Sequence, residues 1–324
     1  MEFQNPGSPG QSRIDSGDPG AIKAVGKKRV DYLRGNKVIT SQVIASRKSW
    51  RYPSVMTTMI QSSTRSPGEL VRKWRQHRRY SQLALAYDAE ISPKHLSFVE
   101  SGRAQPSRDM LMHLAERLDM PLRERNALLL SAGFAPAFKE RPIEHQDLAS
   151  IRQAIELVLA GHEPFPALAI DRHWTLVVAN KGVAPLLTGV AAALLQPPVN
   201  VLRLSLHPEG LAPRIANLAQ WRAHLFARLR QQIDLSADPT LVDLLKELRG
   251  YSTPVSSEGR WTKEEEGLEV IVPFRLMTEQ GTLSFISTTM VFGTPIDITS
   301  SELAIESFFP ADAATAAAIH SSKT

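Results

Sequence analysis

Four serines mark the starts of consecutive short helices, and they limit what this part of the chain can fold into. Each stands directly before a run with helical character: Ser66, Ser81, Ser92 and Ser107. A serine in this place accepts a hydrogen bond from a first-turn backbone N–H that otherwise has no partner. A fifth helical run, "PLRERNALLLSAGF", covers residues 121–134. The pattern predicts a compact all-helical domain of five short helices within residues 64–135.

Two of the four starts combine serine with proline. In "SPGEL", Ser66, Pro67 and Glu69 make a capping box with proline at the first helical position, and this helix should run to about residue 78. "ISPKHLSFVESGR" repeats the Ser-Pro start, and its helix should end near Glu100, where Gly102 is placed to stop it. This third helix is unusual because its exposed face should carry a lysine, a histidine and a phenylalanine.

Apolar residues at helical spacing predict the buried faces of these helices. The third helix should turn Leu96 and Val99 inward, and the second should contribute Leu83, Leu85 and Ala86. In the fourth helix five apolar residues recur at helical spacing: Met110, Leu111, Leu114, Ala115 and Leu118. These positions are the expected core of the helical domain.

The second half of the chain has a different pattern. "PALAIDRHWTLVVAN" predicts two strands joined at Asp171-Arg172, and a hairpin is expected around residues 279–281, where β-branched residues flank a glycine-containing turn. Long helices are expected at about 209–233 and 238–249. A mixed α+β domain over residues 145–318 follows from this combination. Residues 136–144 are the expected linker, with the stretch from Pro136 to Pro142 as its hinge.

Residues 1–63 are rich in glycine, proline, serine and basic residues and show no sustained period. We interpret them as a disordered basic tail. Met56 and Met59 stand just before the first helix signal. We hypothesise that the natural translation start lies at one of these methionines and that the preceding residues are not native.

Charge is distributed unevenly along the chain. Residues 1–65 carry 11 Lys or Arg against 4 Asp or Glu, residues 66–126 carry 11 against 8, and residues 127–324 carry 16 against 21. A polyanionic partner is therefore expected to meet the first half. The chain has no cysteine, which excludes disulfides, thiolate catalysis and cysteine-ligated zinc. It also lacks a long apolar run and a secretory signal, so we expect a soluble, cytoplasmic protein with no membrane partner.

"SQLALAYDAEISPKHLSFVESGRAQPS" resembles the helix-turn-helix of the Xre/Cro-type bacterial regulators, and the likeness extends over residues 66–126. It has the Ser-Gln opening, the serine that starts the recognition helix, and the apolar-Glu-x-Gly-Arg close followed by Pro-Ser. Glu90 departs from the family, which usually has glycine in this turn. The resemblance implies binding to double-stranded DNA, with the third helix of this domain in the major groove.

By position, the resemblance places eight residues at the DNA: Gln82, Ser92, Pro93, Lys94, His95, Ser97, Phe98 and Arg103. Lys94 can donate to guanine, and Phe98 can pack on a thymine methyl. His95 can reach a base or a phosphate, whereas Gln82 and Arg103 resemble the residues of the family that position phosphates.

Several of these assignments have a structural alternative. Phe98 can equally be a core residue under the fourth helix. Glu100 is expected to accept a hydrogen bond from the loop that follows it rather than to contact DNA. Three arginines, Arg75, Arg78 and Arg79, are expected to add counterion release. One recognition helix covers too few base pairs for useful specificity, so a homodimer is expected.

Beyond residue 145 the chain is similar to the ligand-binding domain of MmyB-like regulators, which has a PAS-like fold. The stretches that carry this likeness are "PALAIDRHWTLVVAN", "NVLRLSLHPEGL", "DPTLVDLLKEL", "LAIESFFPAD" and the helix around residues 221–230. The resemblance implies a pocket for a small, apolar or fatty-acid-like ligand, which Trp174, Trp221 and Phe285 are expected to line. Two alternatives stay open: the three residues are ordinary core, or the domain serves only dimerisation and partner docking.

No enzyme activity, cofactor or metal is expected. His207, Glu209 and His224 do not have the spacing of H-E-x-x-H or a comparable signature. "SLHPEG" lacks the glycines of a nucleophile elbow. The acidic run at residues 264–266 is interpreted as a solvated loop.

Overall fold

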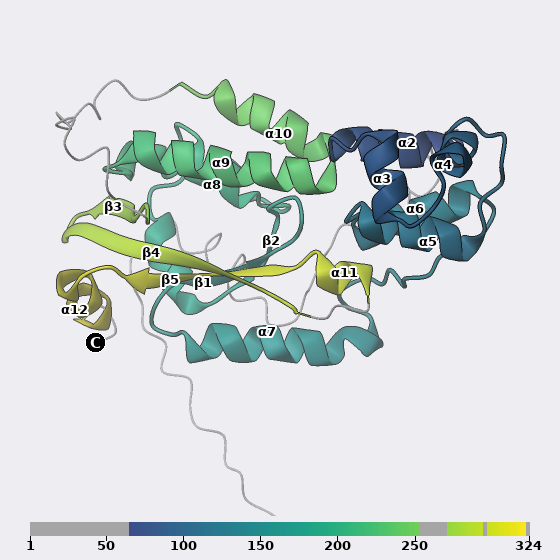
Figure 1. Ribbon diagram of the computed structural model, residues 1–324. Helices are drawn as coiled ribbons and strands as arrows, with labels where there is room; N and C mark the ends of the chain where they lie inside the picture. The colour runs from purple at the N-terminus through teal and green to yellow at the C-terminus, as the bar shows by residue number, and fades with distance from the viewer. Residues whose placement is uncertain (1–64, 253–270, 294–296, 322–324) are drawn as a thin grey trace, which may run out of the picture. The chain divides into compact units, whose positions relative to one another are not determined.

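A computed structural model describes residues 65–252, 271–293 and 297–321 (Figure 1). All of the described residues fall in one compact unit. The basic tail, the two candidate start methionines and the acidic run at 264–266 lie outside the described residues.

Five helices form the first domain, as the serine pattern predicts: α2 (Pro67–His77), α3 (Gln82–Asp88), α4 (Pro93–Glu100), α5 (Arg108–Arg117) and α6 (Leu122–Ser131). Each of the four serines accepts a hydrogen bond from a backbone N–H of its helix. At Ser66 the capping box is complete, because the Glu69 carboxylate also accepts from the Ser66 backbone N–H at 2.8 Å. The predicted all-helical domain is confirmed.

The core of this domain brings α2 against α4, the expected recognition helix. Leu96 and Val99 are buried, as predicted, and Trp74 lies beside Leu85 in the same cluster as Leu96. Gly68 permits the close approach, since a Cβ at this position would lie 2.1 Å from the Val99 carbonyl oxygen. The helix that is expected to read DNA therefore rests on a tight backbone contact.

Leu83 corrects one detail of the predicted core. Leu85 and Ala86 are fully buried, but Leu83 is 67% exposed. Residues two apart are about 200° apart around a helix, so Leu83 and Leu85 cannot face the same core.

The second domain combines one antiparallel sheet with helices on both of its faces. Its strands are β1 (Ala167–Ile170), β2 (Leu176–Ala179), β3 (Phe274–Thr278), β4 (Gly281–Val291) and β5 (Ala304–Pro310), in the order β2-β1-β5-β4-β3. Its helices are α7 (Ala149–Gly161), α8 (Val201–Leu206), α9 (Leu218–Ser236), α10 (Pro239–Arg249), α11 (Ile298–Ser301) and α12 (Ala313–Ser321). In Figure 1, α7 lies on one side of the sheet and α9 and α10 on the other. The predicted α+β class is confirmed.

The sequence patterns located the strands well. β3 and β4 form the predicted hairpin and pair from Phe274↔Phe285 to Thr278↔Gly281, so its turn is residues 279–280 and Gly281 already belongs to β4. β1 and β2 are the two predicted strands, but residues 171–175 join them rather than Asp171-Arg172 alone. The helix expected at 209–233 is wrong at its start, because α9 begins at Leu218. The preceding stretch contains Gly210 and a 3-10 turn, Ala212–Arg214, with Pro213 at its centre.

The stretch expected to be a hinge has a fixed backbone. The Asn126 side chain accepts from the N–H groups of Ala137 and Phe138 and donates to the Phe138 carbonyl. Further along, the Lys139 carbonyl accepts from the N–H of Ile298 at 2.9 Å, and the Arg141 carbonyl from the Thr299 hydroxyl. These bonds tie the expected linker to α6 on one side and to the start of α11 on the other.

Candidate functional site

One face of α4 is open and polar, and the opposite face is buried. Ser92, Pro93 and Lys94 are exposed. His95, Ser97 and Phe98 are partly exposed. Because Ser92 caps the helix through the His95 N–H, the residues expected to meet base edges stand in the first turns of an intact helix.

Two cations lie near the ring of Phe98. The Lys94 Nζ is 5.7 Å from the centre of its ring, and the Arg103 guanidinium carbon is 5.9 Å from it. The Arg103 backbone N–H also donates to the Phe98 carbonyl at 2.8 Å, which fixes the loop after α4. Cations at such distances are attracted to the ring face. Phe98 is therefore part of a half-exposed, basic-aromatic surface rather than a buried core residue.

Glu100 is the centre of a buried polar network. It accepts from Arg75 Nε at 2.6 Å, from Arg75 Nη2 at 2.9 Å and from Gln82 Nε2 at 2.8 Å. Its role is structural, as expected, but its partners lie on α2 and α3 rather than in the following loop. Gln82 has a second amide hydrogen, which leaves it able to donate to a phosphate.

Two of the three arginines expected to attract phosphates are occupied elsewhere. Arg75 is buried against Glu100 and also donates to the Tyr80 carbonyl. Arg78 donates to carbonyl oxygens after α5 and at the end of α9: those of Leu118, Asp119, Asp234 and Leu235. The prediction is wrong for both, because local sequence does not reveal distant carbonyls. Arg79 is exposed.

The turn before α4 has the backbone that favours glycine. Glu90 has φ of 52°, and Arg79 and Asp119 take the same left-handed conformation with φ of 59° and 45°. Neighbouring bonds hold the turn, since the Ile91 N–H donates to the Ala86 carbonyl at 2.9 Å. Glu90 therefore occupies the place of the usual family glycine with a strained backbone.

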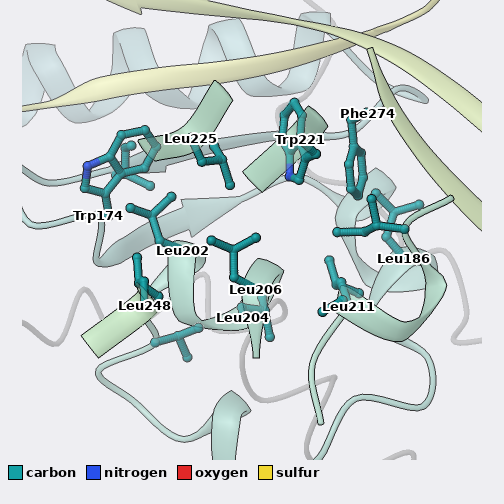
Figure 2. Packing of buried hydrophobic residues seen from close by; sticks show 14 of the residues in the cluster. Trp174, Leu186, Leu202, Leu204, Leu206, Leu211, Trp221, Leu225, Leu248 and Phe274 are labelled. Carbon is teal, nitrogen blue, oxygen red and sulfur yellow. The ribbon is translucent and has the colours of Figure 1, made fainter. Parts of the chain in front are cut away.

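A cavity of about 90 Å³ lies in the second domain between the sheet and the helices. In Figure 2, Trp174 stands on one side and Trp221 with Phe274 on the other, with leucines between them. Its apolar lining includes Trp174, Leu186, Leu202, Leu204, Leu211, Trp221, Leu225, Phe274 and Phe308. Two of the three predicted lining residues are thus at the cavity. Phe285 is not, because it is fully buried behind Phe274 and Phe308, with ring centres 6.3 Å from each.

Two charged side chains also line this cavity, and sequence reasoning missed both. Arg228 on α9 donates to the Glu306 carboxylate on β5 at 2.5 and 3.3 Å. The guanidinium carbon of Arg228 lies 4.9 Å from the centre of the Trp174 ring. The one available sequence signal was a glutamate inside the apolar run "LAIESFF".

Comparison with protein families matches both domains. Residues 68–128 match a helix-turn-helix domain. Residues 151–321, more than half of the chain, match the MmyB-like transcription regulator ligand binding domain. The chain belongs to the MmyB-like transcription regulators. It is a DNA-binding transcriptional regulator with a ligand-binding domain, in agreement with the resemblances that its sequence shows. The search among curated proteins found no significant match.

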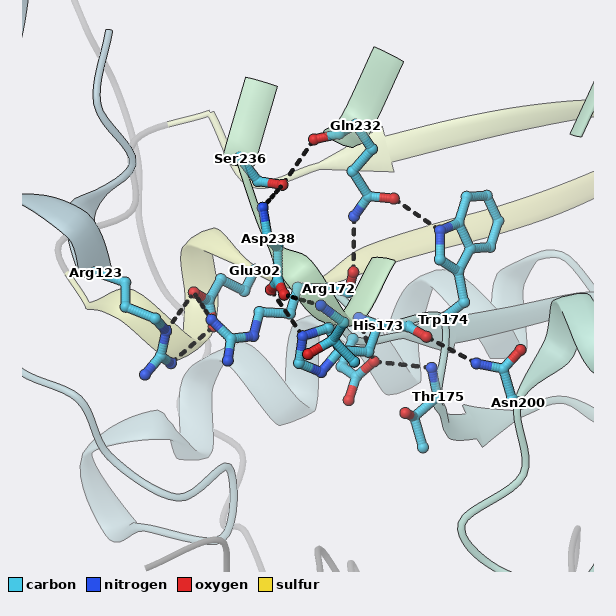
Figure 3. A network of polar contacts seen from close by, with 12 residues as sticks. Arg123, Arg172, His173, Trp174, Thr175, Asn200, Gln232, Ser236, Asp238 and Glu302 are labelled. Atoms are coloured by element: carbon cyan, nitrogen blue, oxygen red, sulfur yellow. Dashed lines mark hydrogen bonds and ion pairs between the residues drawn. The ribbon is translucent and has the colours of Figure 1, made fainter. Parts of the chain in front are cut away.

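A hydrogen-bonded turn positions Trp174 in this MmyB-like regulator (Figure 3). The Asp171 carboxylate accepts from the backbone N–H groups of His173 and Thr175, each at 2.8 Å. Trp174 has φ of 65°, and its Nε1 donates to Gln232 Oε1 at 2.7 Å. The ring at the cavity wall is therefore held by both its own turn and α9.

The same turn is tied to α10 through a histidine–aspartate pair. His173 Nε2 lies 2.8 Å from Asp238 Oδ2, and Asp238 caps α10 through the Thr240 N–H. Burial raises the pKa of Asp238, but the hydrogen bond and charge of His173, with the Thr240 N–H and Arg172, outweigh burial and lower the pKa to about 2. Asp238 is therefore an ionised anchor at neutral pH.

Arg172, in this turn, also connects to the helix-turn-helix domain. Arg123 on α6 donates to both carboxylate oxygens of Glu302, at 2.9 and 3.0 Å, and Arg172 donates to the same carboxylate at 3.3 Å. One glutamate beside β5 thus joins an arginine next to Trp174 to an arginine of the DNA-binding domain (Figure 3).

The residues considered as metal ligands are not grouped as a site. His207 packs edge-on against Tyr251, and His224 stacks on Trp221 at 5.4 Å. Within residues 65–252, 271–293 and 297–321, no group of three or more His, Cys, Asp or Glu side chains is arranged to hold a metal. None of the helices in these ranges is long and apolar enough to cross a membrane.

Proposed function

We propose that this chain is a bacterial one-component transcription factor of the Xre type. It binds operator DNA sequence-specifically as a homodimer and senses a small, apolar or fatty-acid-like ligand through a PAS-like C-terminal domain. The observation that carries the proposal is the apolar cavity, walled by two tryptophans, in the same chain as a helix-turn-helix with an open basic-aromatic face. The sheet order β2-β1-β5-β4-β3, with α8, α9 and α10 between β2 and β3, supports the PAS-like assignment.

For DNA reading, the support comes from the exposed face of α4. Lys94 is exposed and Phe98 is partly exposed on α4, and the Arg103 guanidinium carbon lies 5.9 Å from the centre of the Phe98 ring, so all three are accessible to DNA. A purely apolar contact such as Phe98 on a thymine methyl has value only in the major groove. One short recognition helix contacts too few base pairs for useful specificity. A homodimer that reads two half-sites contacts enough of them.

Selection of bound sequences from a random DNA library by the purified full chain identifies an operator. The affinities of the wild type and the variants for this operator can then be compared. Lys94→Ala is expected to lose roughly 1–3 kcal/mol of discrimination at one base pair, because a base contact disappears. Arg103→Ala is expected to weaken binding to all sequences about equally and to reduce the salt dependence, because a phosphate contact disappears. If both variants lose affinity uniformly over random sequence, the base-reading role of Lys94 is refuted.

For signalling, the support is the link from the cavity wall to α6. A ligand that moves Trp174 acts on the turn that carries Arg172, and Arg172 shares Glu302 with Arg123. Ligand binding would shift a pre-existing equilibrium between dimer arrangements and so change the spacing of the two recognition helices.

The alternative function is a DNA-binding protein whose second domain serves only dimerisation or partner docking. We propose no enzymatic activity for either version. Native mass spectrometry of freshly purified protein separates them, because a ligand held in an apolar cavity often copurifies. A bound small molecule supports the sensor. Absence of any bound mass, together with no thermal shift across a panel of metabolites and fatty acids, supports the docking module.

A further inference from the structure

The charges at the cavity allow the ligand class to be narrowed, and this step rests on the proposed ligand-sensing function. The lining is apolar except for three polar side chains: Ser205, Arg228 and Glu306. Ser205 accepts from Trp221 Nε1 at 3.0 Å and keeps its own hydroxyl hydrogen as a neutral donor. It carries no charge, so it does not separate an anionic ligand from a neutral one as a charged group does. The charged end that remains for a ligand is the pair formed by Arg228 and Glu306.

Arg228 and Glu306 carry opposite charges and are held in direct contact. Arg228 Nη2 donates to Glu306 Oε1 at 2.5 Å, and Nη1 donates to Oε2 at 3.3 Å. Thr289 completes the arrangement, because its hydroxyl accepts from Arg228 and donates to Glu306, each at 2.8 Å. The Glu306 side chain is 5% exposed and that of Arg228 is 24% exposed. The two charges therefore act on a ligand from almost the same place.

No further positive charge comes from the neighbouring histidine. His224 stacks on Trp221, and burial lowers its pKa, with the positive charge of Arg228 lowering it further and Glu306 opposing. This lowered pKa favours the uncharged imidazole. The groups that face the cavity end are thus one cation, one anion and neutral rings.

A carboxylate entering this cavity gains little. Its attraction to Arg228 is offset by repulsion from Glu306, while it still loses its hydration in an apolar surrounding. An uncharged hydroxyl, ester or amide loses far less hydration energy than a carboxylate does. Each can accept from Arg228 in a charge-assisted hydrogen bond, and a hydroxyl or an amide N–H can also donate to Glu306.

We propose that this cavity selects amphipathic ligands with an uncharged polar end, such as alcohols, over fatty acids of the same chain length. Arg228 and Glu306 set this specificity together. Glu306 excludes the ligand carboxylate that Arg228 alone would bind.

Matched pairs of probes test the proposal on the full chain. Titration calorimetry at pH 7.5 compares the 1-alkanol with the alkanoate at each length from six to ten carbons. We expect the alcohol to bind at least tenfold more tightly. Glu306→Gln should reverse the order at least tenfold, because Arg228 is then unopposed. Glu247→Gln, which breaks an exposed Arg–Glu pair in the same domain, should leave the order unchanged.

A second measurement needs no variant. Affinity of the wild type for the alkanoic acid should rise about tenfold for each pH unit as the pH falls toward the acid's own pKa, because the neutral acid is the form that binds. Affinity for the alcohol should not follow this trend. Equal or tighter binding of the alkanoate at pH 7.5 overturns the selectivity while leaving the sensor intact. If no probe binds and no ligand copurifies, both the selectivity and the sensing function fail.

Discussion

Replacing Glu100 with glutamine is expected to loosen the helix-turn-helix domain. The Glu100 side chain is 2% exposed and that of its partner Arg75 is 10% exposed. Removing one charge from a buried pair leaves the other uncompensated, which destabilises proteins by about 3–5 kcal/mol. Glutamine keeps the shape of the side chain and one carbonyl acceptor. We therefore expect a loss near the lower end of this range, about 3 kcal/mol.

Arg203 and Glu247 provide a matched control because they form the same two-bond geometry at the surface. Their hydrogen bonds are 2.8 and 2.7 Å long, but their side chains are 45% and 38% exposed. Exposed ion pairs contribute only about 0.2–1 kcal/mol, since water screens them. Glu247→Gln should therefore lower the free energy of unfolding by less than about 1 kcal/mol.

Hydrogen exchange of the full chain measures both effects peptide by peptide. In Glu100→Gln, a loss of about 3 kcal/mol should speed exchange of peptides from α2 and α4 by roughly 100-fold. In Glu247→Gln these peptides should be unchanged. The double variant Arg75→Met with Glu100→Met should recover much of the loss, because it leaves no buried charge alone. Equal destabilisation by Glu100→Gln and Glu247→Gln would refute the reasoning, since burial would then have no influence.

Three further changes test the local geometry. Glu90→Gly should raise the free energy of unfolding by about 0.5–1 kcal/mol in urea titrations, because glycine adopts positive φ without strain, whereas Gln76→Gly within α2 should lower it. Gly68→Ala should lower the melting temperature and weaken DNA binding, with a loss of about 1–3 kcal/mol, because its Cβ would meet the Val99 carbonyl at 2.1 Å. A Cβ at Gly161 would meet open space, so Gly161→Ala should not lower stability. Equal losses of stability in Gly68→Ala and Gly161→Ala would contradict the predicted clash with the Val99 carbonyl. Because the folded pKa of Asp238, about 2, lies below its unfolded value of 3.8, its contribution is present above about pH 4 and lost as pH falls toward 2. The unfolding free energy of Asp238→Asn should therefore decline less between pH 4 and 2 than that of the wild type, and parallel curves would exclude this role.

Much of the helical domain was predictable because its signals are local. A capping serine bonds to a backbone N–H three residues later, and the inward positions of α4 follow a 3.6-residue period. The unusual backbone before α4 was also predictable, because the family usually has glycine at the position of Glu90, and Glu90 has the positive φ that favours glycine. The hairpin at 279–280 was equally local, since alternation and a glycine determine where two neighbouring strands turn.

What the sequence by itself determined about this protein is therefore the five helices of its first domain, four of the five strands, the resemblance of its two domains to known ones, and the face of α4 that points outward. Only the tertiary structure decided which side chains are occupied. Arg75 and Arg78 were expected at phosphates but bond to a carboxylate and to carbonyls far along the chain. Arg228 meets Glu306 across 78 residues to form the polar end of the cavity, and Phe285 lies one ring behind its wall. Capping and periodicity act over three or four residues, whereas these partners meet only when the elements pack.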